Sequence, residues 1–334
     1  MKDGYGRQIN YLRISLTDKC NLRCIYCMPE EGVCLMPHDA LLSIEEITRC
    51  VKVATRIGIK NVRLTGGEPL VRKGIIALVQ QLSAIPEIEN ISLTTNGTML
   101  KTMALPLKEA GLNRVNISLD TLSRETYALV TRRDKLHEAL EGIQEALRVG
   151  LSPVKINTVT VRSLKENYLE FAKMTLDMPL HVRFIEYMPI GTHVNDPNTG
   201  WGKQDVYPAD ELIEDINHAA LREGLSPLLP VSDMHKPQGS GPARYLAFPG
   251  ARGTVGVISP LSRHFCSECN RLRLTADGKL RPCLFSDKEW DVRTALREGS
   301  DEDVYKVFLQ VLNKNPDEHH DKVGTEREMS QIGG

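Results

Sequence analysis

The stretch Cys20-Asn-Leu-Arg-Cys24-Ile-Tyr-Cys27 places three cysteines close together, and no fourth cysteine continues the pattern. A structural zinc site normally closes with four ligands. Three thiolates instead suit an iron–sulfur cluster in which one iron has no protein ligand and is free to bind another molecule. The stretch therefore predicts a cluster with an open iron. Buried cysteines, or a zinc knuckle completed by a nearby histidine, are the alternatives.

Alternating strand-like and helix-like segments surround this cysteine loop. The run from Tyr11 to Leu16 predicts a strand that leads directly into the loop. Five more strands are expected near residues 61–65, 91–94, 114–118, 154–161 and 181–187. Helical patterns fill the intervals, and Ser43-Ile-Glu-Glu46 has the form of a capping box that begins the first helix. Six such units predict an α/β fold, an incomplete (β/α)6 TIM-like barrel, with a doubly wound sheet as the alternative.

Prolines and glycines gather between Pro189 and Gly202 without hydrophobic periodicity, which predicts a change of domain there. We expect residues 1–195 to form the partial barrel and residues 196–334 to form a smaller carboxyl-terminal α+β region. In the second part, Pro208-Ala-Asp-Glu-Leu212 predicts a helix start, because proline and early acidic residues suit a first helical turn. Short strands are expected over residues 244–248 and 254–258.

Two adjacent glycines follow the second expected strand, in Thr65-Gly66-Gly67-Glu68-Pro69. Glycines at a strand end let the backbone approach a ligand closely, although a tight turn is the simpler interpretation of an isolated pair. Later strands also end in polar residues, at Thr94 to Gly97, Ser118 to Asp120 and Glu186 to Met188. Because functional groups of parallel barrels collect at the carboxyl ends of the strands, these residues predict the lining of a site.

Cations interrupt four of the expected strands, at Arg13, Arg63, Lys155 and Arg183. A cation within an apolar strand is costly to bury unless it is paired. If the alternation of the strands directs these side chains into one barrel, they suit an anionic ligand. If they face outward, they are ordinary solvated charges.

A second cysteine group, Cys266-Ser-Glu-Cys269 followed by Cys283, is also a set of three. Arg271 and Arg273 come directly after it, and guanidinium groups recognise phosphate and carboxylate groups well. The segment therefore predicts a second open cluster beside an anionic substrate. A zinc site completed by His264 is the alternative.

The overall composition, 41% hydrophobic and 25% charged, is ordinary for a soluble globular protein. The net charge of −1 gives no basic field, so nucleic acid is disfavoured as the main partner. No apolar run approaches the length of a membrane span, and no apolar targeting segment begins the sequence. We therefore expect a cytoplasmic, reducing location, where cysteines serve as ligands and the separate Cys34 and Cys50 are ordinary thiols.

These motifs, together with a Gly-Gly pair at the end of the sequence, resemble the GTP 3′,8-cyclase family of radical S-adenosylmethionine enzymes, which opens molybdenum cofactor biosynthesis. The resemblance implies two [4Fe–4S] clusters, S-adenosylmethionine, and conversion of GTP to 3′,8-cyclo-7,8-dihydro-GTP. A radical S-adenosylmethionine peptide-modifying enzyme with an auxiliary cluster is the alternative enzyme. A zinc-ribbon module that binds nucleic acid is the alternative from another class.

The resemblance also implies roles for individual residues. The metal ligands would be Cys20, Cys24, Cys27, Cys266, Cys269 and Cys283. S-adenosylmethionine would contact Tyr26, Gly67, Ser118 and Met188. GTP would contact Arg13, Arg63, Thr94, Lys155, Arg183, Arg271 and Arg273. Catalysis would involve Arg271, Arg273, Gly333 and Gly334, with the glycine tail reaching into the active site. Some family members carry a lysine at the position of Asn61, so no triphosphate contact is expected there.

The implied partners are few. They are GTP as substrate, a reductant of the flavodoxin or ferredoxin type, and the cyclic pyranopterin monophosphate synthase that receives the product. A homodimer is one option for assembly. The resemblance implies neither nucleic acid nor a membrane as a partner.

Overall fold

Six short apolar runs form parallel strands in the computed structural model, as the sequence predicts. They are β1 (Tyr11–Ser15), β2 (Asn61–Thr65), β3 (Asn90–Thr95), β4 (Arg114–Ser118), β5 (Val154–Thr160) and β6 (Leu180–Glu186). The structure describes residues 1–190, 201–232, 236, 237, 239, 241–314 and 327–333. The six strands pair in chain order, because each is followed by a helical crossover that returns the chain to the same end of the sheet. This consecutive order is that of a barrel and lacks the reversal of a doubly wound sheet.

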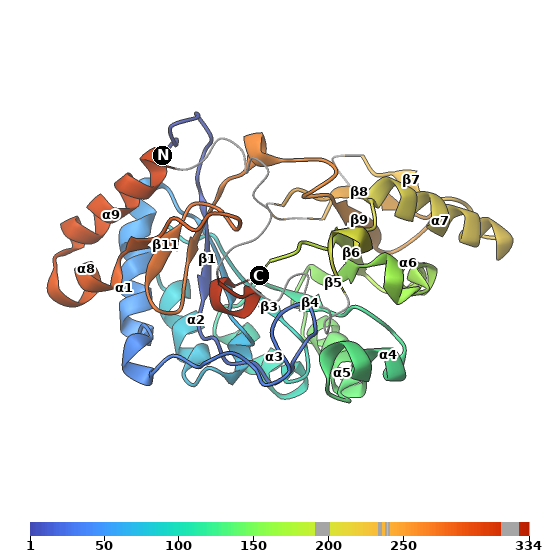
Figure 1. Ribbon diagram of the computed structural model, residues 1–334, viewed down its shortest axis with the longest axis horizontal. Helices are drawn as coiled ribbons and strands as arrows, with labels where there is room; N and C mark the ends of the chain where they lie inside the picture. Colours follow the sequence, from blue (N-terminus) through green and yellow to red (C-terminus); the bar gives the residue numbers. More distant parts are fainter. Residues whose placement is uncertain (191–200, 233–235, 238, 240, 315–326, 334) are drawn as a thin grey trace.

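The crossover helices cover the outer face of the curved sheet (Figure 1). They are α1 (Ile44–Ala54), α2 (Ile75–Ser83), α3 (Leu100–Glu109), α4 (Arg124–Thr131), α5 (Leu136–Arg148) and α6 (Tyr168–Asp177). The predicted capping box is present at α1, where Ser43 Oγ accepts a hydrogen bond from the Glu46 amide and the Glu46 carboxylate accepts one from the Ser43 amide. The apolar faces of these helices pack on the strands, so that residues such as Val51, Leu78 and Leu107 are fully buried.

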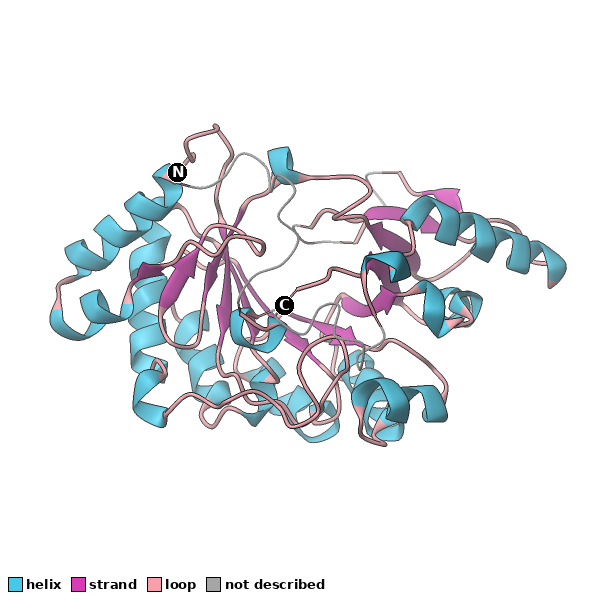
Figure 2. Ribbon diagram, viewed as in Figure 1, coloured by secondary structure: helices cyan, strands magenta, loops and turns pink. Residues whose placement is uncertain are grey.

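The carboxyl-terminal part of the chain extends the same sheet on both sides. Strand β9 (Thr254–Ile258) pairs with β6 in parallel, and β10 (Arg271–Leu274) pairs with β1 in parallel. The outer positions are taken by β8 (Arg244–Ala247), β7 (Leu229–Pro230), β11 (Lys279–Arg281) and β12 (Trp290–Asp291), all antiparallel to their neighbours. The result is one open sheet of twelve strands within the described residues (Figure 2).

Four further helices belong to this part of the chain: α7 (Ala209–Arg222), α8 (Arg293–Glu298), α9 (Asp301–Asn313) and α10 (Met329–Ile332). Helix α7 begins after Pro208 with Asp210 and Glu211 in its first turn, as predicted. Ion pairs from Arg49 on α1 to Asp301 and from Arg56, in the turn directly after α1, to Glu302 join this region to α9. The expected domain change falls largely on residues 191–200, outside the described residues. The division into residues 1–195 and 196–334 therefore stays a prediction.

Candidate active site between the two cysteine groups

The carboxyl ends of the parallel strands surround a cavity of about 300 Å³, and both cysteine groups line it. The first group lies in the loop after β1; in the second group, Cys266 and Cys269 lie just before β10 and Cys283 lies just after β11. Because β10 pairs directly with β1, two groups that are far apart in the sequence face the same space. Neither Cys34, which is exposed, nor Cys50, which is on the buried face of α1, is among the residues that line this cavity.

The first cysteine loop is folded so that its thiols share one side. The amide of Cys27 donates to the Cys24 carbonyl at 2.9 Å, and the amide of Leu22 donates to Cys20 Sγ at 3.4 Å. Burial raises the pKa of Cys20 to about 11 and raises the pKa of Cys24 and Cys27 further. Thiols of this kind ionise readily only when a metal binds them, so the loop suits a metal cluster better than a free thiolate nucleophile.

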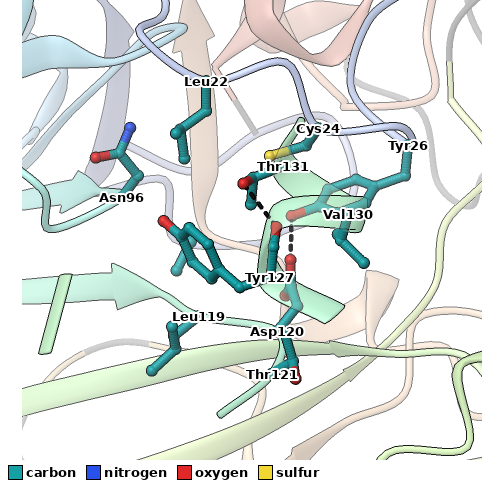
Figure 3. Close-up of a pocket in the computed structure, with 11 residues that line it drawn as sticks. Leu22, Cys24, Tyr26, Asn96, Leu119, Asp120, Thr121, Tyr127, Val130 and Thr131 are labelled. Atoms are coloured by element: carbon teal, nitrogen blue, oxygen red, sulfur yellow. Dashed lines mark hydrogen bonds between the residues drawn. The ribbon is translucent and has the colours of Figure 1, made fainter. Parts of the chain in front are cut away.

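Tyr26, the aromatic residue of this loop, is held from two sides, and Figure 3 shows its contact with Asp120. Its hydroxyl donates to Asp120 Oδ2 at 2.6 Å, and Asp120 Oδ1 accepts from the Val159 amide at 2.9 Å. The Tyr26 ring also stacks on Trp201, with centroids 5.6 Å apart and planes 5° apart. Sequence reasoning missed Trp201, because nothing in its local pattern indicates which distant ring it meets. This arrangement fixes the tyrosine beside the last two cysteines.

The glycine pair after β2 packs against the backbone that leads into the cysteine loop. A Cβ atom on Gly67 would come within 2.3 Å of the Lys19 carbonyl oxygen, so only glycine fits at this position. The Gly67 amide donates to the Thr17 carbonyl at 2.7 Å, and the Glu68 amide donates to the Lys19 carbonyl at 2.8 Å. The turn therefore has a structural role, and the Gly67 carbonyl is the backbone group that a cationic ligand could use.

Glu68 joins the ends of β2 and β3, a role that sequence reasoning did not assign. Its carboxylate accepts hydrogen bonds from Thr95 Oγ1 at 2.7 Å, from the Asn96 amide at 2.7 Å and from the Leu70 amide at 3.0 Å. Burial raises the pKa of Glu68 to about 7, although these hydrogen bonds favour the charged form. The carboxylate thus fixes the floor of the cavity beneath the cysteine loop.

Three arginines occupy aligned positions on three adjacent strands. Arg13 on β1 is the register partner of both Arg273 on β10 and Arg63 on β2, and all three are buried and line the cavity. Burial and the two neighbouring guanidinium groups lower the pKa of Arg13 well below its usual value. Like charges this close repel one another, and a bound anion would relieve the repulsion. Of the two orientations that the sequence leaves open, the inward one is therefore found at these positions.

Neutral groups orient the other inward cations without cancelling their charge. Arg183 donates to Asn116 Oδ1 at 2.8 Å and to Asn157 Oδ1 at 2.5 Å. Lys155 is buried but does not line the cavity as Arg183 does. Burial, together with Arg183 and other cations, lowers the pKa of Lys155 to about 6. The positive charge of these buried side chains favours an anion in the barrel interior.

The remaining predicted contact residues also lie at the cavity. Thr94, Ser118 and Met188 line it, and Thr94 Oγ1 is buried with no hydrogen-bond partner among the described residues. A buried hydroxyl without a partner is costly, so Thr94 has bonding capacity to offer a ligand. Arg271 lies with its guanidinium carbon 5.2 Å from the centre of the Phe265 ring. The structure thus places these residues as expected, while their contacts with a ligand stay predictions.

The second cysteine group has a different electrostatic environment from the first. Burial raises the pKa of Cys269, but the charge and hydrogen bonds of Arg271 outweigh this effect and leave the pKa below its usual value. His264, the residue of the zinc alternative, has its Nδ1 atom 3.0 Å from the Pro260 carbonyl oxygen. Among the described side chains, no group of three or more His, Cys, Asp or Glu could hold a single metal ion. Two sets of three thiols around one cavity are the donor sets that two open clusters require.

Gly333, directly after α10, packs against Arg273 and Thr65, two residues that line the cavity. Arg273 Nη1 donates to the Gly333 carbonyl at 2.7 Å. Gly333 has φ +70°, and a Cβ atom there would lie 2.7 Å from Thr65 Cγ2 and 3.4 Å from Ser15 Cβ. Gly333 thus lies beside residues of the cavity wall, while a role of the tail in the active site stays a prediction. Gly334 lies outside the described residues.

Comparisons with known families and proteins agree with this geometry. The profile of the Radical SAM superfamily matches residues 14–174, and the profile called Molybdenum Cofactor Synthesis C matches residues 180–321. The chain is 50% identical to the GTP 3′,8-cyclase of Pelotomaculum thermopropionicum and 49% identical to that of Moorella thermoacetica, with full coverage of both partners in each case. The GTP 3′,8-cyclase of Desulforamulus reducens is 47% identical over the same extent.

Solved structures share the fold at lower sequence identity. Streptococcus suis SuiB bound to S-adenosylmethionine superposes with a TM-score of 0.60 at 16% identity, covering 89% of this chain and 66% of SuiB. The structure called anSMEcpe with bound AdoMet superposes with a TM-score of 0.54 at 16% identity, covering 89% of this chain and 80% of that one. These likenesses bear out the incomplete barrel and carry no argument about substrate.

Proposed function

Because the chain belongs to the GTP 3′,8-cyclase family of radical S-adenosylmethionine enzymes, it performs the first step of molybdenum cofactor biosynthesis, and we propose that the cavity between its two cysteine groups is the site of that step. The reaction converts GTP to 3′,8-cyclo-7,8-dihydro-GTP and uses two [4Fe–4S] clusters. One observation carries the proposal: both cysteine groups and the aligned arginines open into a single cavity.

Cys20, Cys24 and Cys27 would hold the cluster that, with S-adenosylmethionine, supplies a 5′-deoxyadenosyl radical. Tyr26, Gly67, Ser118 and Met188 would contact S-adenosylmethionine. Gly67 would use its carbonyl oxygen, because its amide hydrogen is already donated to Thr17. The fixed ring of Tyr26 orients the loop, and the protein's contribution is positioning and exclusion of water.

Cys266, Cys269 and Cys283 would hold the second cluster, toward which the guanine ring faces. The GTP contacts would be Arg13, Arg63, Thr94, Lys155, Arg183, Arg271 and Arg273. The aligned arginines would hold the triphosphate, since guanidinium forks match phosphate oxygens and no carboxylate is bonded to Arg63, Arg183 or Arg273 among the described residues. Gly333 and Gly334 would act beside Arg273.

Replacing Arg273 with alanine is expected to weaken GTP binding by about 1.5–3 kcal/mol, the range for a charge-assisted hydrogen bond. The expectation follows from its buried position beside Arg13 and its place on the cavity wall. Calorimetric titration of GTP into the reconstituted variant measures the change. Arg124→Ala, at an exposed arginine paired with Asp134, is the control. Unchanged affinity together with unchanged turnover would remove Arg273 from the substrate site.

The reductant, the enzyme that receives the product, the cellular location and the assembly are proposals as well. A flavodoxin or ferredoxin type of reductant would supply electrons, and the product would pass to the cyclic pyranopterin monophosphate synthase. We propose a cytoplasmic location and leave a homodimer as one option. Among the helices within the described residues, none has the length and apolar character needed to cross a membrane.

Anaerobic purification with metal and product analysis tests the proposed function. About eight iron atoms per chain, with matching sulfide, are expected for two [4Fe–4S] clusters. Turnover with S-adenosylmethionine, reductant and GTP should yield the cyclised nucleotide by mass spectrometry. Zinc without sulfide, or an intact pair of clusters that leaves GTP unchanged, would contradict the proposal. The second outcome would favour the peptide-modifying alternative.

A further inference from the structure

A further arginine lies in the row of aligned inward residues. The register that joins Arg273, Arg13 and Arg63 continues through Ser92 on β3 to Arg114, the first residue of β4. The Arg114 side chain belongs to a residue that is only 4% exposed. Sequence reasoning did not single it out, because a cation in the first position of a strand is usually solvated.

The charge of Arg114 is not neutralised by the part of the protein that the structure describes. Its Nε and Nη2 atoms are buried and have no hydrogen-bond acceptor there. The groups whose charges act on it are Arg63 and the two tyrosines Tyr11 and Tyr245, with no carboxylate among them. Burying an uncompensated guanidinium group is costly, so the fold retains a position that only an anion would stabilise.

The charged groups around Arg114 include further cations. Arg114, Arg63 and Arg183 all act on Lys155, and together with its burial they lower its pKa to about 6. Arg63 and Arg183 line the cavity, and Tyr11, whose ring lies 5.4 Å from the Arg63 guanidinium carbon, does so too. A ligand that extends from the cavity toward the amino ends of the strands therefore meets increasing positive charge.

We propose that Arg114 binds the terminal phosphate of the nucleotide substrate and makes the site select a triphosphate. This inference rests on the proposed function, in which guanine faces the second cysteine group at the carboxyl ends of the strands. The phosphates then extend in the opposite direction, past the aligned arginines. Arg114, at the amino end of β4, does not itself line the cavity, but its charge acts on that of Arg63, which does, and it offers two N–H groups to phosphate oxygens.

Calorimetric titration of the cluster-loaded protein with GTP, GDP, GMP and guanosine tests this role. Arg114→Gln is expected to weaken GTP binding about tenfold or more, the loss of a charge-assisted contact, while GMP and guanosine bind as in the wild type. Arg114→Lys, which keeps the charge and loses the fork, should recover part of the GTP affinity. Tripolyphosphate should compete with GTP in the wild type and compete less well in Arg114→Gln.

The exposed Arg124→Gln variant is the matched control, because it removes one guanidinium group that is paired with Asp134 on the surface and does not line the cavity. Equal loss of affinity for all four ligands, or unchanged GTP affinity, would overturn the role of Arg114. A wild-type protein that binds none of the guanine ligands would instead overturn the proposed function on which it rests. The two failures are therefore distinguishable in one series of titrations.

Discussion

Replacing Cys24 with alanine is expected to abolish reductive cleavage of S-adenosylmethionine, whereas replacing Cys269 with alanine should spare much of that cleavage and abolish the cyclised nucleotide. The two cysteines lie on opposite borders of one cavity and in different environments. Cys24 is buried among groups that raise its thiol pKa, whereas Arg271 lowers the pKa of Cys269. The first group thus lies beside the Tyr26–Asp120 pair, and the second lies beside Arg271, a cation that suits an anionic substrate.

Both products of this experiment are measured in one anaerobic assay, by mass spectrometry of 5′-deoxyadenosine and of the nucleotide. Cys34→Ala is the matched control, since Cys34 is exposed and does not line the cavity. It should leave both products at wild-type levels. If the Cys269→Ala protein cyclised GTP at nearly the wild-type rate, the assignment of the second group to the substrate would be wrong.

Deleting Gly333 and Gly334 is expected to leave both clusters and GTP binding largely intact and to reduce GTP-coupled formation of 5′-deoxyadenosine and cyclised product severely. The reason is the place of Gly333, whose carbonyl accepts a hydrogen bond from Arg273 inside the cavity. Gly333→Ala should act in the same direction, because its Cβ would lie 2.7 Å from Thr65 Cγ2 and its φ of +70° disfavours a side chain.

The Gly250→Ala variant separates the effect of side-chain crowding from the effect of an unfavourable backbone conformation. Gly250 has nearly the same backbone conformation, φ +77°, but a Cβ atom there meets nothing within 4 Å. Alanine at this position has the same unfavourable backbone conformation but adds no atom to the active site. Turnover should therefore stay at the wild-type level. Anaerobic turnover with detection by mass spectrometry gives the comparison. A truncated protein that cyclises GTP normally would show that the tail has no part in the reaction.

The strands and the cysteine groups could be predicted because each depends on local pattern, whereas the direction of the strand arginines was left open. Apolar runs separated by helical periodicity specify β1 to β6, and side-chain alternation places Arg13 and Arg63 on the same face. The pairing of β10 with β1 could not be predicted in this way. No short turn connects residues 11–14 to residues 271–274. No local sequence pattern therefore indicates that these two segments pair in parallel.

Sequence reasoning also missed the roles that residues acquire through contacts with distant parts of the chain, because no local pattern indicates such contacts. Glu186 was expected among polar residues that line the site, but its carboxylate accepts hydrogen bonds from the amides of Ala209, Leu261 and Ser262. It therefore joins the end of β6 to α7 and to the segment before the second cysteine group. Glu68 and Asp120 likewise acquire their functions only through tertiary contacts, which composition and spacing do not specify.

The pairing of β9 with β6 and of β10 with β1 also matters while the chain is being synthesised. A nascent chain that has released only the six βα units has unpaired edges on both β1 and β6, and such edges are templates for aggregation. They are covered only when residues 254–274 emerge, and contacts so distant in sequence are slow to form. The last part of the sequence thus protects the barrel edges within the same molecule, in addition to carrying the second cysteine group.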